Sequence, residues 1–181
     1  MKNKLNFGIL TLAILLTSAI LAHAQTSPTN KSSKEKPKMK EETKLEAVQT
    51  VEKMFAAFNR RDADALAALY ADDVFVDSPD FPQPKRTPAE VAAHYREMFR
   101  QFPDIRDDVQ SITASGNRVV VEFISYCTVE NPSAEMPPSV KGKKFSLKIA
   151  SILEVVNGKI VRDITYYDQL SVLKQMGLMP D

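Results

Sequence analysis

The chain has 181 residues, of which 44% are hydrophobic, with 24 basic residues, 23 acidic residues and a single cysteine. This length allows one domain with its own hydrophobic core. Cys127 alone excludes an internal disulfide, and with no Cys/His cluster in the sequence we expect neither a metal nor a cofactor.

The first 24 residues have the pattern of a secretory signal peptide. Lys2 and Lys4 precede an almost wholly apolar run over residues 7–21, and Ala22-His23-Ala24 fits a cleavage site. We therefore predict a secreted or periplasmic protein that is cleaved between Ala24 and Gln25. No stable membrane insertion is expected after cleavage.

The rest of the chain divides into a spacer and a domain. Residues 25–44 are rich in Lys, Ser, Thr and Pro, which predicts a disordered spacer. Residues 45–181 carry 16 basic and 20 acidic residues and predict the one folded domain. A mildly acidic domain argues against nucleic-acid binding, for which a basic face is expected.

Apolar spacing predicts three helices in the first half of the domain. The first covers residues 45–59 and the second residues 63–70, with Asp62 as its N-cap. A short strand over residues 74–76 and a proline-rich loop follow. Thr87, Pro88 and Glu90 then form a capping box that begins the third helix, which ends before Pro103.

The second half of the domain changes to the period of two that is typical of strands. Residues 109–114 and 118–130 predict one hairpin, residues 144–167 a second, and residues 169–176 a short closing helix. Helices followed by a long antiparallel sheet give an α+β order. We expect a cone, in which a strongly curved, mostly antiparallel sheet wraps about three helices and leaves a pocket at its wide end.

The turn of the second hairpin, Asn157-Gly158, decides which side chains share a face. A two-residue type I′ turn would place Leu153 opposite Arg162, so that both faces mix charged and aliphatic residues. A type I turn followed by Gly158 as a bulge shifts the register by one residue. We favour the bulge because it gives one apolar face, whose members are Phe145, Leu147, Ile149, Ser151, Leu153, Val155, Val161, Asp163, Thr165 and Tyr167.

Several segments resemble the SnoaL-like proteins of the nuclear transport factor 2-like superfamily. The similar segments are Phe55 to Val74, Asn157 to Ile160, Tyr166 to Asp168 and Leu173 to Pro180. The resemblance covers residues 45–180 and implies the cone-shaped α+β fold. It specifies the activity less closely, because this superfamily includes cyclases, isomerases, dehydratases, epoxide hydrolases and plain binding proteins.

The resemblance also implies where acidic residues would act. Polyketide cyclases of the family use an Asp on the last strand for an intramolecular aldol closure. That position falls on Thr165 here, and the acid stands two residues earlier, at Asp163. The Arg and Asp of limonene-epoxide-hydrolase-like members fall on Phe123 and Ser125, so epoxide hydrolysis is not expected.

These observations predict a catalytic site around Asp163. Ser151, Thr165 and Tyr167 could donate hydrogen bonds to its carboxyl, and Tyr167 or Ser125 could polarise a substrate oxygen. Asp77 is a second candidate acid. The predicted pocket suits a small, mostly apolar ligand and comprises Phe75, Asp77, Tyr95, Phe99, Phe123, Cys127, Leu147, Ile149, Ser151, Leu153 and Thr165.

A structural role for Asp163 remains open at this point. Its carboxyl could simply pair with a polar group inside the cone, such as Tyr70 or His94. The domain would then be a non-catalytic ligand-binding module or a dimeric scaffold. We expect a homodimer through the outer sheet face, where Ile152, Ile164 and Tyr166 would otherwise be exposed.

Overall fold

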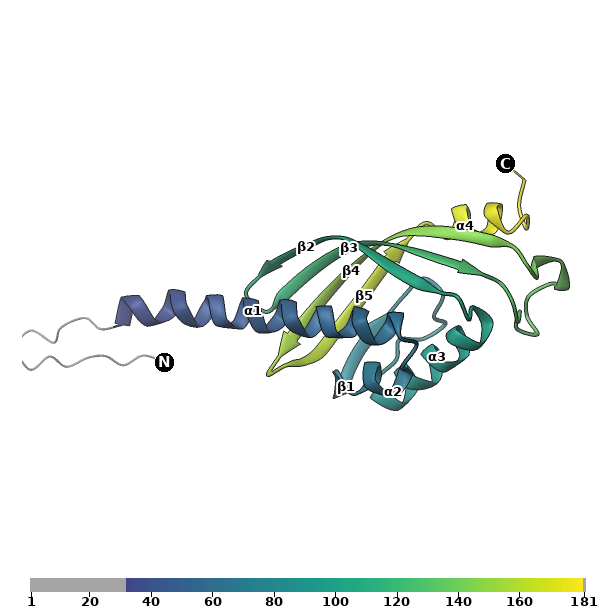
Figure 1. Cartoon of the computed structure of the whole chain (residues 1–181). Coiled ribbons are helices and arrows are strands. Elements are labelled where there is room, and N and C mark those ends of the chain that lie inside the picture. The colour runs from purple at the N-terminus through teal and green to yellow at the C-terminus, as the bar shows by residue number, and fades with distance from the viewer. Residues whose placement is uncertain (1–31, 181) are drawn as a thin grey trace, which may run out of the picture. The chain divides into compact units, whose positions relative to one another are not determined.

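The computed structural model describes residues 32–180, in which one curved sheet carries three helices on its concave side (Figure 1). The elements are α1 (Ser32–Asn59), α2 (Ala63–Ala67), β1 (Tyr70–Asp77), α3 (Pro88–Gln101), β2 (Arg106–Ser115), β3 (Arg118–Thr128), η1 (Pro138–Val140), β4 (Lys144–Val156), β5 (Lys159–Tyr167) and α4 (Gln169–Gln175). The prediction of an α+β cone is confirmed.

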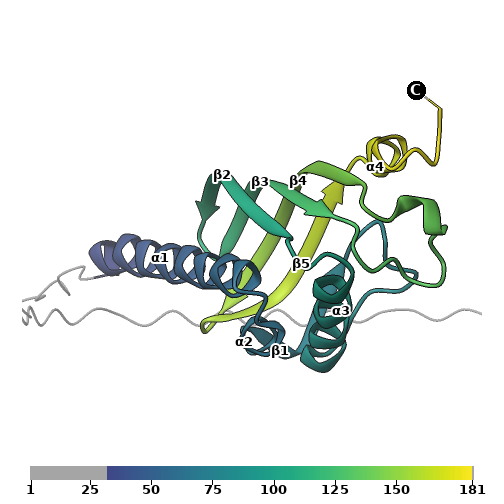
Figure 2. The same cartoon turned by 45° about the vertical axis from the view of Figure 1, so that its right-hand side comes forward.

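The sheet has five strands in the order β1-β5-β4-β3-β2. All neighbours pair antiparallel except β1 and β5, which run parallel. Helices α1, α2 and α3 lie on the same side of this sheet, and α4 lies away from them beside β4 (Figure 2). The core fills the space between α1 and the concave face, with Val51, Val119 and Leu153 fully buried.

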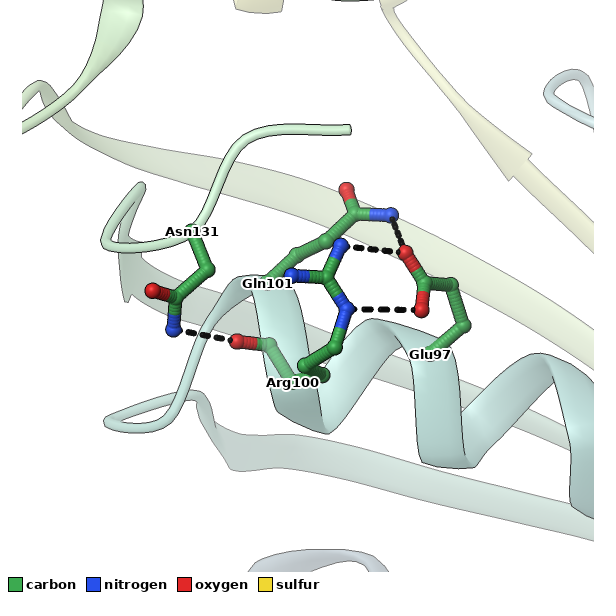
Figure 3. Close-up of polar contacts among 4 residues, drawn as sticks. All are labelled: Glu97, Arg100, Gln101 and Asn131. Carbon is green, nitrogen blue, oxygen red and sulfur yellow. Dashed lines mark hydrogen bonds and ion pairs between the residues drawn. The ribbon is translucent and has the colours of Figure 1, made fainter. Parts of the chain in front are cut away.

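Helix α3 is fixed at both ends by side chains. The predicted capping box is present, because the Thr87 hydroxyl accepts from the Glu90 backbone while the Glu90 carboxylate accepts from the Thr87 backbone. At the other end, Glu97 accepts from Arg100 and Gln101, and the Asn131 amide donates to the Arg100 carbonyl oxygen at 2.8 Å (Figure 3). The segment that follows β3 is thereby attached to the end of α3.

Helix α1 begins earlier than predicted. The structure is helical from Ser32, whereas the sequence predicted disorder up to Lys44. Residues 38–42 are exposed, so packing does not stabilise this part of the helix. Glu and Lys are good helix formers, however, and ion pairs join Lys38 to Glu42 and Glu41 to Lys44 along the helix. Extending a helix already held by packing costs little.

The predicted signal peptide and the beginning of the predicted spacer lie outside the described residues. Within residues 32–180, none of the helices combines the length and the apolar character needed to cross a bilayer.

Strand β1 is longer than predicted and includes the last residue of the predicted second helix. Residues 63–70 were predicted as helix, but α2 ends at Ala67 and Tyr70 begins β1. The cause is a tertiary contact, because Tyr70 pairs with Ile160 of β5 in the parallel part of the sheet. The local periodicity of the sequence cannot reveal a pairing between such distant residues. Strand β2 likewise begins at Arg106 and not at residue 109.

The β4–β5 turn differs from the predicted turn type. Asn157 has a φ of +52° and Gly158 a φ of +68°, the pattern of a two-residue type I′ turn, and Val156 pairs with Lys159 across it. The register then shifts between the pairs Glu154–Arg162 and Val155–Ile160, which leaves Val161 as an extra residue.

This bulge gives the predicted register beyond the turn by another route. Leu153 faces Asp163 and Ser151 faces Thr165, so the inward placement of Asp163 is confirmed. The prediction for Val161 was wrong, because Ile160 takes the inward place next to Val155 and is fully buried.

Candidate functional site

The carboxyl of Asp163 lies on the concave face, buried near the middle of β5. The residue is 4% exposed, and its Oδ2 accepts a hydrogen bond of 2.9 Å from the Tyr70 hydroxyl. Its Oδ1 is also buried and has no partner in the described part of the chain. Burial raises the pKa of Asp163 to about 6, and the bond from Tyr70 opposes this rise.

Tyr70 is the side chain that holds this carboxyl. Its hydroxyl also lies 3.4 Å from the sulfur of Met54, but it has one proton, and a carboxylate is the stronger acceptor. Burial, followed by the neighbouring Asp163, raises the pKa of Tyr70 well above its ordinary value. The phenol therefore remains protonated and acts as a fixed donor.

The predicted donors to Asp163 have other partners. The hydroxyls of Ser151 and Thr165 bond to each other at 2.8 Å. Tyr167 shares the concave face, but its pKa is raised by burial and by Asp80, which places its hydroxyl beside the loop after β1. The prediction that these three residues donate to Asp163 was therefore wrong, and Tyr70, considered only as a structural partner, is the donor.

The three predicted catalytic residues share one face without forming one cluster. Asp163 lies across from Leu153, which in turn pairs with Val119 of β3. Ser125 is 4% exposed and six residues further along β3, about 20 Å at the rise of a strand. The sheet does not bring Ser125 to Asp163, so Ser125 cannot polarise the carbonyl oxygen next to a carbon that Asp163 deprotonates.

The predicted pocket walls divide between the two faces of the sheet. Phe123, Cys127, Leu147, Ile149 and Leu153 lie on the concave face as predicted. Phe75 and Asp77 do not, because they pair with Arg162 and Ile164 of the convex face. Phe75 lies between the guanidinium groups of Arg86 and Arg162, and Asp77 accepts from the Ser78 backbone at the end of β1.

Aromatic side chains from the helices cover the concave face. Phe55 meets Phe123 edge-on with ring centres 4.9 Å apart. Phe58 meets Tyr95 and Phe99 of α3 at 5.8 Å and 5.3 Å. The ring centres of His94 and Phe81 lie 4.6 Å apart, and burial lowers the pKa of the His94 imidazole. Among the described residues Tyr70, and not His94, is the hydrogen-bond partner of Asp163.

Asp107 is a second concave-face carboxyl, and the sequence prediction missed it. It is the second residue of β2 and faces Ser125. Burial raises its pKa to about 7, opposed by Ser125, and its Oδ1 is buried without a partner among the described residues. If the strand predicted from residue 109 had been extended by two residues toward the N-terminus, Asp107 would have fallen on the same face as Val109.

Two open clefts lie outside the covered interior. One of about 500 Å³ is lined by Arg60, Arg61, Asp62, Ala63, Asp64, Arg96 and Phe99 where the helices meet. Another of about 380 Å³ lies at the ends of β3 and β4, and Cys127 and Phe145 reach it from the concave face. Residues 32–180 contain no group of three or more His, Cys, Asp or Glu side chains placed to hold a metal.

Comparisons with known proteins agree with this architecture. A family model described as SnoaL-like polyketide cyclase matches residues 48–176. A search of curated proteins found no significant match.

Many solved structures are similar to the chain. IdmH of Streptomyces antibioticus, a candidate polyketide cyclase, is 25% identical, with a TM-score of 0.62 over 72% of this chain and 98% of IdmH. An NTF2-like protein of unknown function from Burkholderia pseudomallei is 25% identical, with a TM-score of 0.61 over 72% and 97%. An LEH-like epoxide hydrolase of M. tuberculosis, 20% identical with a TM-score of 0.60 over 75% and 92%, shares the fold alone.

Proposed function

Because the chain belongs to the SnoaL-like polyketide cyclase family, we propose that it binds a small, mostly apolar molecule on the concave face and catalyses a cofactor-free cyclisation or isomerisation through Asp163. The observation that carries the proposal is the free, buried Oδ1 of Asp163. A protein rarely leaves a buried carboxylate oxygen unpaired unless the group has a function.

The chemistry follows from the environment of the carboxyl. With a pKa of about 6, Asp163 is mostly ionised at neutral pH and is still a much stronger base than an exposed aspartate. Its Oδ1 would take a proton from the carbon next to a substrate carbonyl, and the enolate carbon would then attack a second carbonyl or be reprotonated elsewhere. Asp163 then returns the proton to the alkoxide formed by that attack, or to the other carbon in an isomerisation, so the reaction consumes nothing.

Tyr70 would position the base in this reaction. It holds Oδ2 at 2.9 Å, while Oδ1 stays buried and without a partner among the described residues. The fold of this family typically binds small ligands, and the concave face here offers Phe123, Leu147 and Ile149 as apolar contacts.

The test is carbon-bound proton exchange in a model ketone. The methyl protons of 2-acetonaphthone exchange with deuterium oxide once a base removes them, and proton NMR follows the loss of signal. We expect the protein to accelerate this exchange and Asp163→Asn to slow it by about 100-fold or more. Asp108→Asn, which removes an exposed carboxylate of β2, should leave the exchange rate unchanged. Equal rates for Asp163→Asn and the wild type would exclude catalysis by this carboxyl.

A non-catalytic binding domain is the second candidate. It is favoured by the Tyr70–Asp163 bond, which already satisfies one carboxylate oxygen within the core. Binding of 2-acetonaphthone with no accelerated exchange would support this candidate instead.

We also propose that the protein is exported. The N-terminal pattern of residues 1–24 supports this, and the intact mass of the exported chain should correspond to a first residue Gln25. A mass that retains Met1 would contradict it.

A further inference from the structure

Two buried oxygen atoms stand apart from all other buried polar side-chain atoms of residues 32–180. They are Oδ1 of Asp107 and Oδ1 of Asp163, the two buried side-chain nitrogen or oxygen atoms of residues 38–180 that lack a hydrogen-bond partner. Both belong to the concave face, since Asp107 faces Ser125 and Asp163 faces Leu153. The proposed function uses Asp163 and leaves Asp107 without a role.

The backbone of Asp107 is fixed by the last residue of α1. The Asn59 side-chain oxygen accepts from the Asp107 N–H at 2.8 Å, and the Asn59 amide donates to the Asp107 carbonyl at 2.9 Å. This amide replaces the neighbouring strand that the sheet edge lacks. It holds the start of β2 in the sheet, where the partly buried Asp107 side chain lies on the concave face.

Other polar side chains lie close to this carboxyl without bonding to its free oxygen. Burial raises the pKa of Cys127 to about 12, and the carboxylates of Asp104 and Asp107 add to this rise. Burial raises the pKa of Tyr95 in α3, and the carboxylates of Asp163 and, to a smaller extent, Asp107 add to this rise. The Tyr95 hydroxyl therefore lies within the electrostatic field of both carboxylates. Cys127 also lines the cleft of about 380 Å³ at the ends of β3 and β4, which gives this end of the concave face an opening to solvent.

We propose that Asp107 is a second ligand-binding carboxyl and that the ligand carries a hydroxyl or N–H group at the end away from Asp163, which donates to Oδ1 of Asp107. The inference rests on the proposed function, because it concerns the same bound molecule. An unpaired buried carboxylate oxygen is unfavourable, and a donor supplied by the ligand would satisfy it. Asp107 would thus make the site bind ligands with a donor group more tightly than apolar molecules of the same shape.

The selectivity can be measured with two probes of one shape. The hydroxyl of 2-naphthol donates a hydrogen bond, whereas the methoxy group of 2-methoxynaphthalene cannot. We expect the wild-type chain to bind 2-naphthol at least about 10-fold more tightly, because a site built to pair with a hydroxyl disfavours the analogue without one. Asp107→Leu should abolish this preference, and Asp108→Leu, the matched change at the exposed neighbour, should retain it.

A second measurement does not depend on how the variants fold. The carboxyl carbons of Asp107 and Asp163 can be assigned through bonds in the wild-type chain by carbon-13 NMR and followed as 2-naphthol is added. A shift of the Asp107 signal with 2-naphthol and none with 2-methoxynaphthalene is the expected result.

The outcomes separate this inference from the proposed function. If only the Asp163 signal responds, Asp107 does not bind the ligand, and the role of Asp163 stands. If only the Asp107 signal responds, the second carboxyl is supported, and the role of Asp163 is decided by the exchange test with 2-acetonaphthone. If neither signal responds, or if both probes bind equally well with Asp107 unchanged, the inference is overturned.

Discussion

The Asp163 carboxyl is controlled by two opposing effects at the level of single residues. Burial disfavours its ionised form, and the hydroxyl of Tyr70 favours it. Burial is the larger effect, so the pKa rises to about 6 and not below its ordinary value. This balance brings the pKa of the carboxyl close to the pH of the solution, as general acid–base catalysis requires.

The same shift predicts a pH dependence of stability. The folded carboxyl keeps its proton up to about pH 6, whereas the unfolded one loses it near its ordinary value of 3.8. The folded state therefore binds more protons in this window, and the free energy of unfolding falls as pH rises. Two pKa units correspond to at most about 3 kcal/mol.

Urea unfolding at pH 4, 5, 6 and 7 would measure this effect. Relative to wild type, Asp163→Asn should become more stable by up to about 3 kcal/mol between pH 4 and pH 7, since the variant has no charge to bury. The comparison cancels other titrating groups, such as Asp107 and His94. Asp108→Asn should run parallel to wild type, and a parallel Asp163→Asn curve would show that the carboxyl is not perturbed.

The sequence located one carboxyl correctly and missed its surroundings, for reasons that particular residues show. Asp163 was found because the alternation of β4 and β5 leaves one charge on an apolar face. Tyr70 looked like the end of a helix, because its pairing with Ile160 joins residues 90 positions apart. Asp107 was overlooked because two further aspartates and an arginine surround it, and only the structure shows its pairing with Ser125 and its bonds to the Asn59 amide.

At the level of elements, the β4–β5 hairpin obtained its register by a route that the sequence did not predict. Gly158 was expected to form the bulge, but the structure has a type I′ turn and places the extra residue at Val161. A period-two pattern reports which residues must face inward, and several combinations of turn and bulge satisfy it. The pattern therefore specifies the face of Asp163 more firmly than the turn.

Removing the extra residue tests this account of the hairpin. Deleting Val161 should keep Glu154 opposite Arg162 and Leu153 opposite Asp163, because the pairing already passes over this residue, so the variant should lose no more than about 1 kcal/mol. Val161→Ala keeps the residue count and should lose only about 1 kcal/mol. Thermal unfolding of the two variants gives the comparison. A deletion variant several kcal/mol less stable than Val161→Ala would mean that the extra residue itself is needed to hold the register.

At the scale of the whole molecule, the two faces of the sheet differ. Within residues 32–180, its concave face is covered by helices and carries Asp107 and Asp163, whereas no helix covers its convex face over the middle of β4 and β5. Tyr166 is 57% exposed there, and Ile152 and Ile164 beside it are only partly buried. An apolar strip of this kind on a sheet is more typical of an interface than of a free surface.

We therefore expect the domain to form a homodimer through this convex strip. Light scattering during size-exclusion chromatography should give twice the mass of the mature chain, and Ile164→Lys should shift it to the monomer because two copies would bring lysines together in an apolar interface. Gln49→Lys adds the same charge at an exposed position of α1 and should remain dimeric. If wild type and both variants are monomers at micromolar concentration, the strip is not a self-association surface. If Ile164→Lys remains a dimer while wild type is one, the copies meet through another face.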